Sequence, residues 1–264
     1  MKTGQSWGPP LFDYDTLIKY AKLPATHKRY IIIGDVHGQL DDLNKLLKKV
    51  SFNMSEDLII LAGDLVNKGQ DSLGVVRLAQ KIGAKCVRGN HENYLYSIRK
   101  EIQLKQPSKK WKDAQVSLTN QMDINDWKYL DSCPLVLELP DLDEKVVVAH
   151  AGVDANAPID DQDPNFTMYV PHMPNLKVAN KYYTAHENWQ EEWAQKHSQD
   201  GMTGVYGHTE LKTLDIRPLA KGIDTSCYLG GELTANIYPG DEIVSVKCTD
   251  YNKQEKPEAT PLLE

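Results

Sequence analysis

Short apolar runs alternate with amphipathic stretches through the first half of the chain. The runs have the length of strands, whereas the stretches between them place apolar residues three and four positions apart, as on one face of a helix. The predicted strands are 29–33, 58–62 and 85–88, and the predicted helices are 40–50, 70–82 and one that begins near residue 92. Because a glycine follows each strand, the order of strand, turn and helix repeats. This alternation is typical of an α/β layered fold with a largely buried sheet.

The second half of the chain has a different pattern. Helical stretches near 113–131 are followed by a long segment over 154–180 that is rich in Pro, Asp and Asn. We expect a surface loop or cap there, because long unstructured segments are seldom simple connectors. The other predicted elements are a short helix at 13–22, a helix around 187–197 and strands at 135–139, 146–149, 205–206, 213–216, 233–238 and 243–247.

Composition excludes several classes of protein. The 264 residues are 41% hydrophobic and 25% charged, which suits a folded globular chain rather than a disordered or fibrous one. No apolar run approaches the roughly 20 residues that a membrane span needs. The 30 Lys and Arg residues against 37 Asp and Glu residues give a net charge of −7, which disfavours a general nucleic-acid binder.

The N-terminal sequence and the cysteines indicate a cytoplasmic protein. The first residues contain no apolar region of the kind that a secretory signal has. The cysteines form no C-x-x-C pair, which argues against a zinc ribbon or a disulfide scaffold, and we expect reduced, mostly buried thiols. They are Cys86, Cys133, Cys227 and Cys248.

Short polar motifs lie directly after apolar runs. Each is a weak signal by itself, because Gly-Asp is a common turn and a lone His beside a strand is usually a core residue. All of them carry atoms that can bind a metal ion, and ligands of α/β folds collect at the carboxyl ends of the strands. The motifs are Gly34-Asp35-Val36-His37-Gly38, Gly63-Asp64-Leu65-Val66-Asn67-Lys68-Gly69, Gly89-Asn90-His91-Glu92, His150-Ala151-Gly152 and Gly207-His208-Thr209. We therefore expect these side chains to converge on one crevice.

The polar side chains of the motifs suffice for a pair of divalent metal ions. The expected ligands are Asp35, His37 and Asp64 for one ion and Asp64, Asn90, His150 and His208 for the other, with Asp64 as the bridge. Mixed carboxylate, amide and imidazole ligands suit Mn, Fe, Co or Zn. Two ions roughly 3.5–4 Å apart lower the pKa of a bridging water and bind the attacking and leaving oxygens of a displacement at phosphorus. Their positive charge attracts phosphate although the chain is acidic.

These motifs resemble those of the calcineurin-like metallophosphoesterases, in the branch that includes the phosphoprotein phosphatases. The resemblance covers about residues 29–249, which we take as the domain, with an N-terminal arm over 1–28 and a flexible tail over 250–264. It implies an α/β (α+β) fold, a four-layer αββα sandwich with a small helical or loop cap. It also implies that His91 is the general acid that protonates the leaving oxygen.

The second motif distinguishes branches of that family. Protein Ser/Thr phosphatases typically have G-D-Y-V-D-R-G, whereas this chain has Asn67 and Lys68 at the second Asp and the Arg. Asn67 is neutral and would stabilise a His91 imidazolium less than Asp does, and Lys68 offers a point charge rather than a bidentate fork. The string Asn-Lys-Gly-x-Asp-Ser, with Gln70 at x, resembles the ApaH-like phosphatases, relatives of bacterial diadenosine tetraphosphatase. A late motif, Gly222-Ile223-Asp224-Thr225-Ser226, resembles the same group.

This resemblance implies hydrolysis of phosphoanhydride bonds by a metal-bridging hydroxide. Dinucleoside polyphosphates, inorganic polyphosphate and the bridge of an RNA cap at a 5′ end are the expected substrates. Lys68 and Asn90 are the expected phosphate contacts, and His91 and Asn67 the catalytic residues. A phosphoprotein Ser/Thr phosphatase and a non-catalytic phosphate-binding module are the alternatives.

Two further features leave alternatives open. The basic segment 99–112 can be a solvated helix face or a guide for a long polyanion. Trp189 and Trp193, four residues apart, can pack a helix or, with Tyr182 and Tyr183, stack on a nucleobase.

Overall fold

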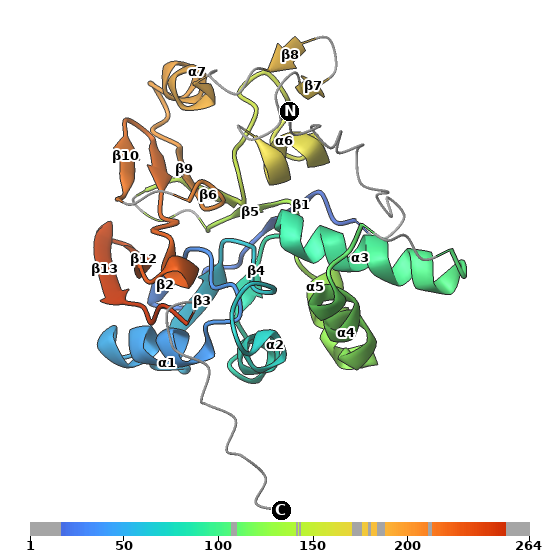
Figure 1. The fold of residues 1–264 in the computed structure, drawn as a ribbon. Coiled ribbons are helices and arrows are strands. Elements are labelled where there is room, and N and C mark those ends of the chain that lie inside the picture. The colour runs from blue at the N-terminus through green and yellow to red at the C-terminus, as the bar shows by residue number, and fades with distance from the viewer. Residues whose placement is uncertain are drawn as a thin grey trace, which may run out of the picture.

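Two β-sheets lie between layers of helices in the computed structural model (Figure 1). The structure describes residues 17–106, 110–140, 142, 144–170, 176–178, 181–183, 188–210 and 213–251. Most of the predicted arm and nearly all of the predicted tail lie outside these residues, so the boundaries at 28 and 250 stay predictions.

The first sheet contains the strands predicted from the first half of the chain. Its order is β13-β12-β2-β3-β4. The strands are β2 (Arg29–Ile33), β3 (Asp57–Leu61), β4 (Lys85–Cys86), β12 (Glu232–Tyr238) and β13 (Glu242–Lys247). β2, β3 and β4 are parallel, and β12 pairs antiparallel with both β2 and β13.

The second sheet has the order β1-β5-β6-β9-β11-β10. The strands are β1 (Tyr20–Lys22), β5 (Val136–Glu138), β6 (Val146–Ala149), β9 (Thr203–Tyr206), β10 (Asp215–Arg217) and β11 (Ala220–Gly222), and a separate pair is β7 (Leu176–Val178) with β8 (Lys181–Tyr183). The helix predicted at 13–22 is wrong for residues 20–22, because β1 forms a parallel pair with β5. The Tyr20 hydroxyl also donates a hydrogen bond to Glu138. This long-range pairing overrides the local preference.

Alternate side chains of the strands separate the core into layers. Tyr30 and Ile32 point into the core between the sheets, together with Val146 and Val148 of the second sheet. Their neighbours Ile31 and Ile33 face the helices on the other side. Because side chains alternate across a strand, one continuous apolar run covers both faces of a buried sheet.

Helices cover the outer face of each sheet. Apolar residues of the first five helices join the cluster beyond the first sheet, and those of the last two join the cluster beyond the second. The helices are α1 (Leu40–Lys49), α2 (Ser72–Lys81), α3 (Asn90–Gln103), α4 (Asp113–Gln121), α5 (Ile124–Asp131), α6 (Pro164–Tyr169) and α7 (Trp189–Lys196), with a 3₁₀ helix at Cys227–Leu229. The predicted αββα sandwich is confirmed (Figure 1). Among the described residues, no helix combines the length and the apolar character of a membrane span.

The expectation of reduced cysteines is wrong. Cys86 is bonded to Cys133, and Cys227 to Cys248. The partners are 47 and 21 residues apart in sequence, so spacing alone did not pair them, but the fold brings their Cα atoms to 4.9 and 5.3 Å. The expected burial is confirmed, since each is at most 6% exposed. The thiols no longer support a cytoplasmic location, which stays a prediction.

The ion pair at the start of the first sheet gives a test of the fold. Arg29 donates to both oxygens of Asp57, at 2.8 and 2.7 Å, and the backbone N–H of Asn53 donates to Asp57 at 2.8 Å. Burial raises the pKa of Asp57, but these donors outweigh burial and hold the pKa below its ordinary value. A carboxyl whose pKa is lower in the folded chain stabilises the fold above its unfolded pKa, and this contribution is lost as the pH falls.

We expect Asp57→Asn to lower the free energy of unfolding at pH 7, because the charged contact with Arg29 is lost. The loss should be only about 1–2 kcal/mol, because Arg29 is partly exposed to solvent. The difference from the wild type should shrink below about pH 4, where the carboxyl of the unfolded wild-type chain becomes protonated before that of the folded chain. Urea unfolding of both chains from pH 7 to pH 3 measures it. Asp161→Asn, in an exposed pair with Lys19, is the control and should stay close to the wild type. A difference that does not depend on pH would contradict the assignment.

Candidate metal centre

The predicted ligands all follow the carboxyl ends of parallel strands. Asp35 and His37 come after β2, Asp64 after β3, and Asn90 opens α3 after β4. His150 follows β6 and His208 follows β9 of the other sheet. The crevice therefore lies at one end of the sandwich and receives side chains from both sheets.

The backbone turns sharply at three of these residues. His37, Asp64 and His208 have φ angles of 47°, 50° and 66°, in the left-handed region that non-glycine residues rarely adopt. Gly63, with φ of 90°, lies so close to His150 that a Cβ atom would be 2.6 Å from Nδ1 of that ring. Such strain persists where the surroundings fix the chain, and it is common at functional sites.

Glu92 fixes the loops that carry Asp64 and Asn90. It is fully buried, and its carboxylate accepts hydrogen bonds from the backbone N–H groups of Asp64 and Gly89 at 2.9 Å and of Leu65 at 2.8 Å. The bond to Gly89 also caps the start of α3. The metal-binding motifs do not indicate this role of Glu92, although a Glu at the third position of a helix is the known signal of a capping box.

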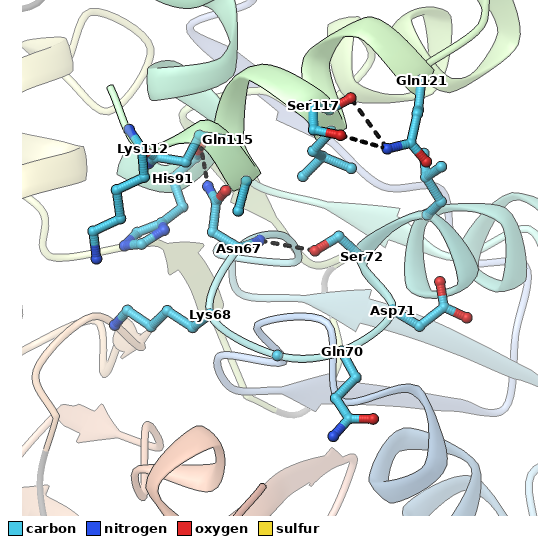
Figure 2. Close-up of a pocket in the computed structure, with 14 residues that line it drawn as sticks. Asn67, Lys68, Gln70, Asp71, Ser72, His91, Lys112, Gln115, Ser117 and Gln121 are labelled. Atoms are coloured by element: carbon cyan, nitrogen blue, oxygen red, sulfur yellow. Dashed lines mark hydrogen bonds between the residues drawn. The ribbon is translucent and has the colours of Figure 1, made fainter. Parts of the chain in front are cut away.

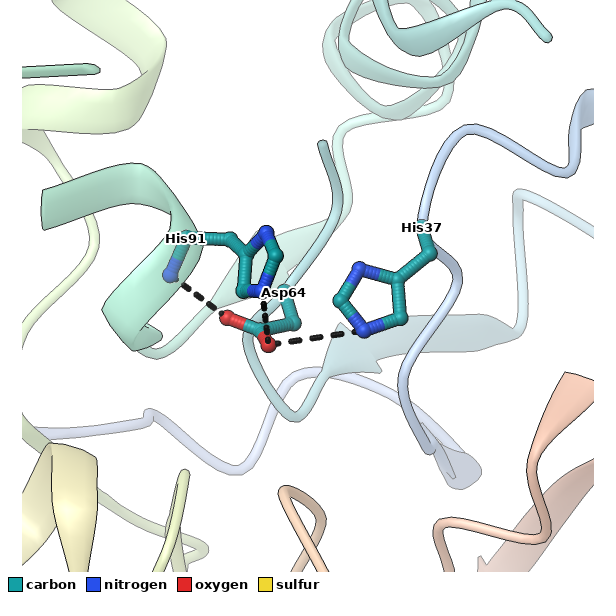
Figure 3. A group of neighbouring side chains, drawn as sticks. All are labelled: His37, Asp64 and His91. Carbon is teal, nitrogen blue, oxygen red and sulfur yellow. Dashed lines mark hydrogen bonds and ion pairs between the residues drawn. The ribbon is translucent and has the colours of Figure 1, made fainter. Parts of the chain in front are cut away.

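His37 lies near the carboxylates of both Asp64 and Asp35. Nε2 of His37 is 3.5 Å from Oδ2 of Asp64 and 3.8 Å from Oδ2 of Asp35. Nδ1 of the same ring is 3.1 Å from the carbonyl oxygen of Val66, which orients Nε2 toward the carboxylates. Figure 3 shows His37 and His91 on either side of Asp64, with Nε2 of His91 3.9 Å from Oδ2.

His150, His208 and Asn90 gather near the other oxygen of Asp64. Nε2 of His150 is 3.3 Å from Oδ1 of Asp64 and 2.9 Å from Oδ1 of Asn90. Nδ1 of His208 is 3.1 Å from both Asn90 Oδ1 and His150 Nε2. The carbonyl oxygen of Ala62 contacts Nδ1 of His150 at 2.8 Å, which turns Nε2 into the crevice.

Both groups of donor atoms fit a divalent cation. Ligands at about 2.0–2.2 Å from an ion lie roughly 3 Å from one another, close to the separations found here. All six side chains are buried, at 9% exposure or less. His37, Asp64 and His91 form one set of atoms close enough to share an ion, and Asp64, His150 and His208 form another. The donor types match those that Mn, Fe, Co and Zn accept.

The electrostatics of the crevice also favour a cation. Burial raises the pKa of Asp35 well above its ordinary value, and the nearby Asp224 adds to this shift. Burial lowers the pKa of His150, but Asp64 and Asp35 outweigh it and raise the pKa to about 10. Burial also acts to raise the pKa of Asp64. The neighbouring histidines outweigh burial and hold this pKa well below its ordinary value. A cation among these groups would relieve the unfavourable burial of two neighbouring carboxylates.

His91 lies at the rim of the crevice. Its side chain is 14% exposed, and its backbone N–H donates to Oδ1 of Asp64 at 2.9 Å. Burial lowers the pKa of His91 to about 4. Nδ1 of the ring is buried without a hydrogen-bond partner. The amide of Asn67 donates to the backbone carbonyl of His91 at 3.3 Å and so helps to position the backbone of His91.

Lys68 has two neighbours that the motifs did not predict. Its ammonium lies 2.6 Å from Oε1 of Glu210 and 3.9 Å from the centre of the Tyr228 ring. The Tyr228 hydroxyl donates to the same Glu210 oxygen at 2.7 Å, and its ring packs against His37. Neither residue belongs to a recognisable motif, and only the fold brings them beside Lys68.

The comparisons with known proteins identify the family. Residues 28–238 match the model of the calcineurin-like phosphoesterases, so the chain belongs to this family. The chain is therefore a metal-dependent hydrolase, and the family uses divalent metal ions.

Individual relatives resemble the chain over most of its length. A bis(5′-nucleosyl)-tetraphosphatase PrpE [asymmetrical] of Anoxybacillus flavithermus is 30% identical over 83% of this chain and 94% of its own. The protein of the same name from Oceanobacillus iheyensis is 27% identical over 84% and 96%. A crystal structure of a protein provisionally described as a diadenosine tetraphosphatase is 33% identical, with a TM-score of 0.72 over 88% of this chain and 99% of that one.

We expect Glu92→Gln to loosen the metal centre without changing any ligand. Each oxygen of Glu92 accepts from two backbone N–H groups, so an amide nitrogen in place of one oxygen would face two donors. The free energy of unfolding should fall by about 1–3 kcal/mol, because buried donors lose their acceptor. The metal content after dialysis against a weak chelator should fall as well.

Urea unfolding and elemental analysis measure the two effects. Glu56→Gln, an exposed residue paired with Lys28, is the matched control. Wild-type stability and metal content in the Glu92→Gln protein would show that the carboxylate does not hold these loops.

Proposed function

We propose that this protein hydrolyses the phosphoanhydride chain of dinucleoside polyphosphates at a centre of two divalent metal ions. The observation that carries the proposal is the position of Asp64, whose two oxygens face separate groups of donor atoms. The names of the relatives support this substrate class over the other phosphoanhydrides.

Each ion has its own set of ligands in this proposal. Asp35, His37 and Asp64 hold one ion, and Asp64, Asn90, His150 and His208 hold the other. Mn²⁺, Zn²⁺, Co²⁺ and iron suit these donors. When bound, such a pair of ions activates a water molecule as nucleophile and polarises the phosphate.

The other side chains bind the substrate and handle the proton. Lys68 and Asn90 bind phosphate oxygens, and Lys68 exchanges Glu210 for a phosphate when the substrate enters. His91 donates its proton to the leaving oxygen from the rim of the crevice. The negative charge of the substrate favours the protonated ring there. Asn67 positions His91 through its backbone carbonyl.

A phosphoprotein phosphatase is the less suitable alternative. Lys68 cannot form the bidentate contact that an arginine makes with a phosphate monoester. The Asn67 amide donates to the backbone carbonyl of His91. The deciding experiment compares diadenosine tetraphosphate, inorganic polyphosphate, capped RNA and a phosphopeptide as substrates of the metal-loaded protein. The proposal requires the highest kcat/KM for diadenosine tetraphosphate, and a preference for the phosphopeptide would refute it.

We expect Asp64→Ala to abolish both metal binding and turnover, because the variant removes a ligand of each ion. Elemental analysis should find neither ion, and hydrolysis should fall to background. Asp161→Asn is the control for a surface carboxylate and should retain both properties. Near-normal activity of Asp64→Ala would eliminate the scheme, and loss of only one ion would eliminate the bridging role.

We expect His91→Asn to lower kcat for diadenosine tetraphosphate by about 10²–10⁴-fold, as is usual for loss of a general acid. The loss should be smaller for p-nitrophenyl phosphate, whose leaving group needs little protonation. The metal content should equal that of the wild type, because His91 is not one of the proposed ligands. Equal losses for both substrates would show that His91 does not act as the acid.

A further inference from the structure

A pocket of about 520 Å³ opens beside the metal centre (Figure 2). It lies between the loop that carries Asn67 and Lys68 and the side of α4, and His91 forms part of its wall. Its volume is within the range of small-molecule sites, which is roughly 300–1,000 Å³. None of the sequence motifs assigned a role to α4.

Charge is unevenly distributed along this pocket. Figure 2 shows Lys68, Lys112 and His91 at one end, and Ser117, Gln121 and Asp71 at the other. The first end can attract phosphate. The second end offers the hydroxyl of Ser117, the amide of Gln121 and the carboxylate of Asp71. Of these three side chains, Asp71 alone is charged, and its charge is negative. A phosphate chain that extended along the whole pocket would meet this carboxylate, so the far end suits an uncharged, hydrogen-bonding group.

Apolar side chains also line the pocket. Leu73 of α2 and Leu118 of α4 both line it. Gln121 donates to the hydroxyl of Ser117 at 2.9 Å, which holds its amide at the far end. An apolar wall with a few placed polar groups suits a nucleoside, whose base and ribose combine a flat face with polar edges.

The aromatic candidates from the sequence do not provide this site. Trp189 and Trp193 are each 2% exposed and belong to the core beyond the second sheet. Trp193 also donates from its ring nitrogen to the carbonyl oxygen of Met202. Both therefore pack helix α7, as one of the two hypotheses stated, and they are closed to a nucleobase. The side chains of Tyr182 and Tyr183 lie outside the described residues.

We propose that this pocket binds the nucleotide on the leaving side of the substrate. Because His91 lines the pocket and protonates the leaving oxygen, the group held there is the one that departs. Its phosphate lies near Lys68 and Lys112, and its nucleoside reaches Leu118 and Gln121. The proposal rests on the proposed function, and it makes α4 the element that selects a nucleotide over a bare phosphate chain.

A bulky side chain at the far end of the pocket tests this proposal by its effect on ligand binding, which is measured without turnover. Ser117 is an exposed residue of α4, so Ser117→Trp blocks the pocket without disturbing the core. Asn120→Trp, on the same helix but outside the pocket, is the matched control. Calorimetry on the metal-loaded proteins compares AMP with inorganic phosphate and with tripolyphosphate.

We expect the wild type and Asn120→Trp to bind AMP at least about tenfold more tightly than inorganic phosphate. Ser117→Trp should lose this difference and retain its affinity for phosphate. Its kcat/KM ratio of diadenosine tetraphosphate to p-nitrophenyl phosphate should also fall about tenfold. Equal affinities of the wild type for AMP and phosphate would overturn the proposal. Equal losses of AMP and tripolyphosphate in Ser117→Trp would overturn it too, because the pocket would then be a channel for phosphate.

The binding measurements and the hydrolysis assay test the nucleotide pocket and the proposed function separately. If the wild type binds AMP through the pocket but does not hydrolyse diadenosine tetraphosphate, the nucleotide site is supported and the proposed substrate is refuted. If the wild type hydrolyses this substrate and Ser117→Trp changes neither binding nor hydrolysis, the function is supported and the role of the pocket is refuted.

Discussion

The carboxylate of Asp64 must present each of its oxygens to a different group of buried donors, and the surrounding structure is arranged around this demand. His37 approaches one oxygen at 3.5 Å and His150 approaches the other at 3.3 Å. The carboxylate is held in this position, because the backbone N–H of His91 donates to its Oδ1 and Gly89 packs against it with no room for a Cβ atom. Glu92 then holds the backbone of Asp64 and Gly89 together. The centre therefore depends on a second, buried carboxylate that we expect to touch neither ion nor substrate.

Side chains from both sheets meet at the crevice. β2, β3 and β4 supply Asp35, Asp64 and Asn90 from one side, whereas β6 and β9 supply His150 and His208 from the other. The inter-sheet core, with Ile32 and Val148 among its members, fixes the separation of these two edges. Protein interiors are closely packed and transmit small shifts. Substitutions in this core should therefore alter the geometry of the site, although the core residues lie outside it.

Much of the fold was predictable because its signals are local. The apolar runs at 29–33 and 58–62 and the glycines after them mark the strand ends, and the strand ends gather the ligands. What could not be predicted depends on contacts distant in sequence. β1 is a strand only because β5 lies beside it, and Cys86 meets Cys133, 47 positions further along the chain, only after the segment between them has folded. Glu210 and Tyr228 reach Lys68 in the same way. The proposed ligands belong to local motifs, whereas Glu210 and Tyr228, which contact the proposed phosphate-binding residue Lys68, do not.

The contact between Lys68 and Glu210 bears on the choice of substrate. Glu210 is paired with the ammonium group of Lys68, which a phosphate would need to contact. Tyr228 holds Glu210 in place through a hydrogen bond. A ligand must offer more negative charge than this carboxylate to displace it, and a polyphosphate chain does so more readily than a single ester phosphate. The pocket beside α4 then discriminates at the other end, where Asp71 disfavours further phosphate groups and Leu118 favours a nucleoside. A substrate that is highly anionic near the metal ions and uncharged about one nucleotide away satisfies both requirements, which is the pattern of a dinucleoside polyphosphate.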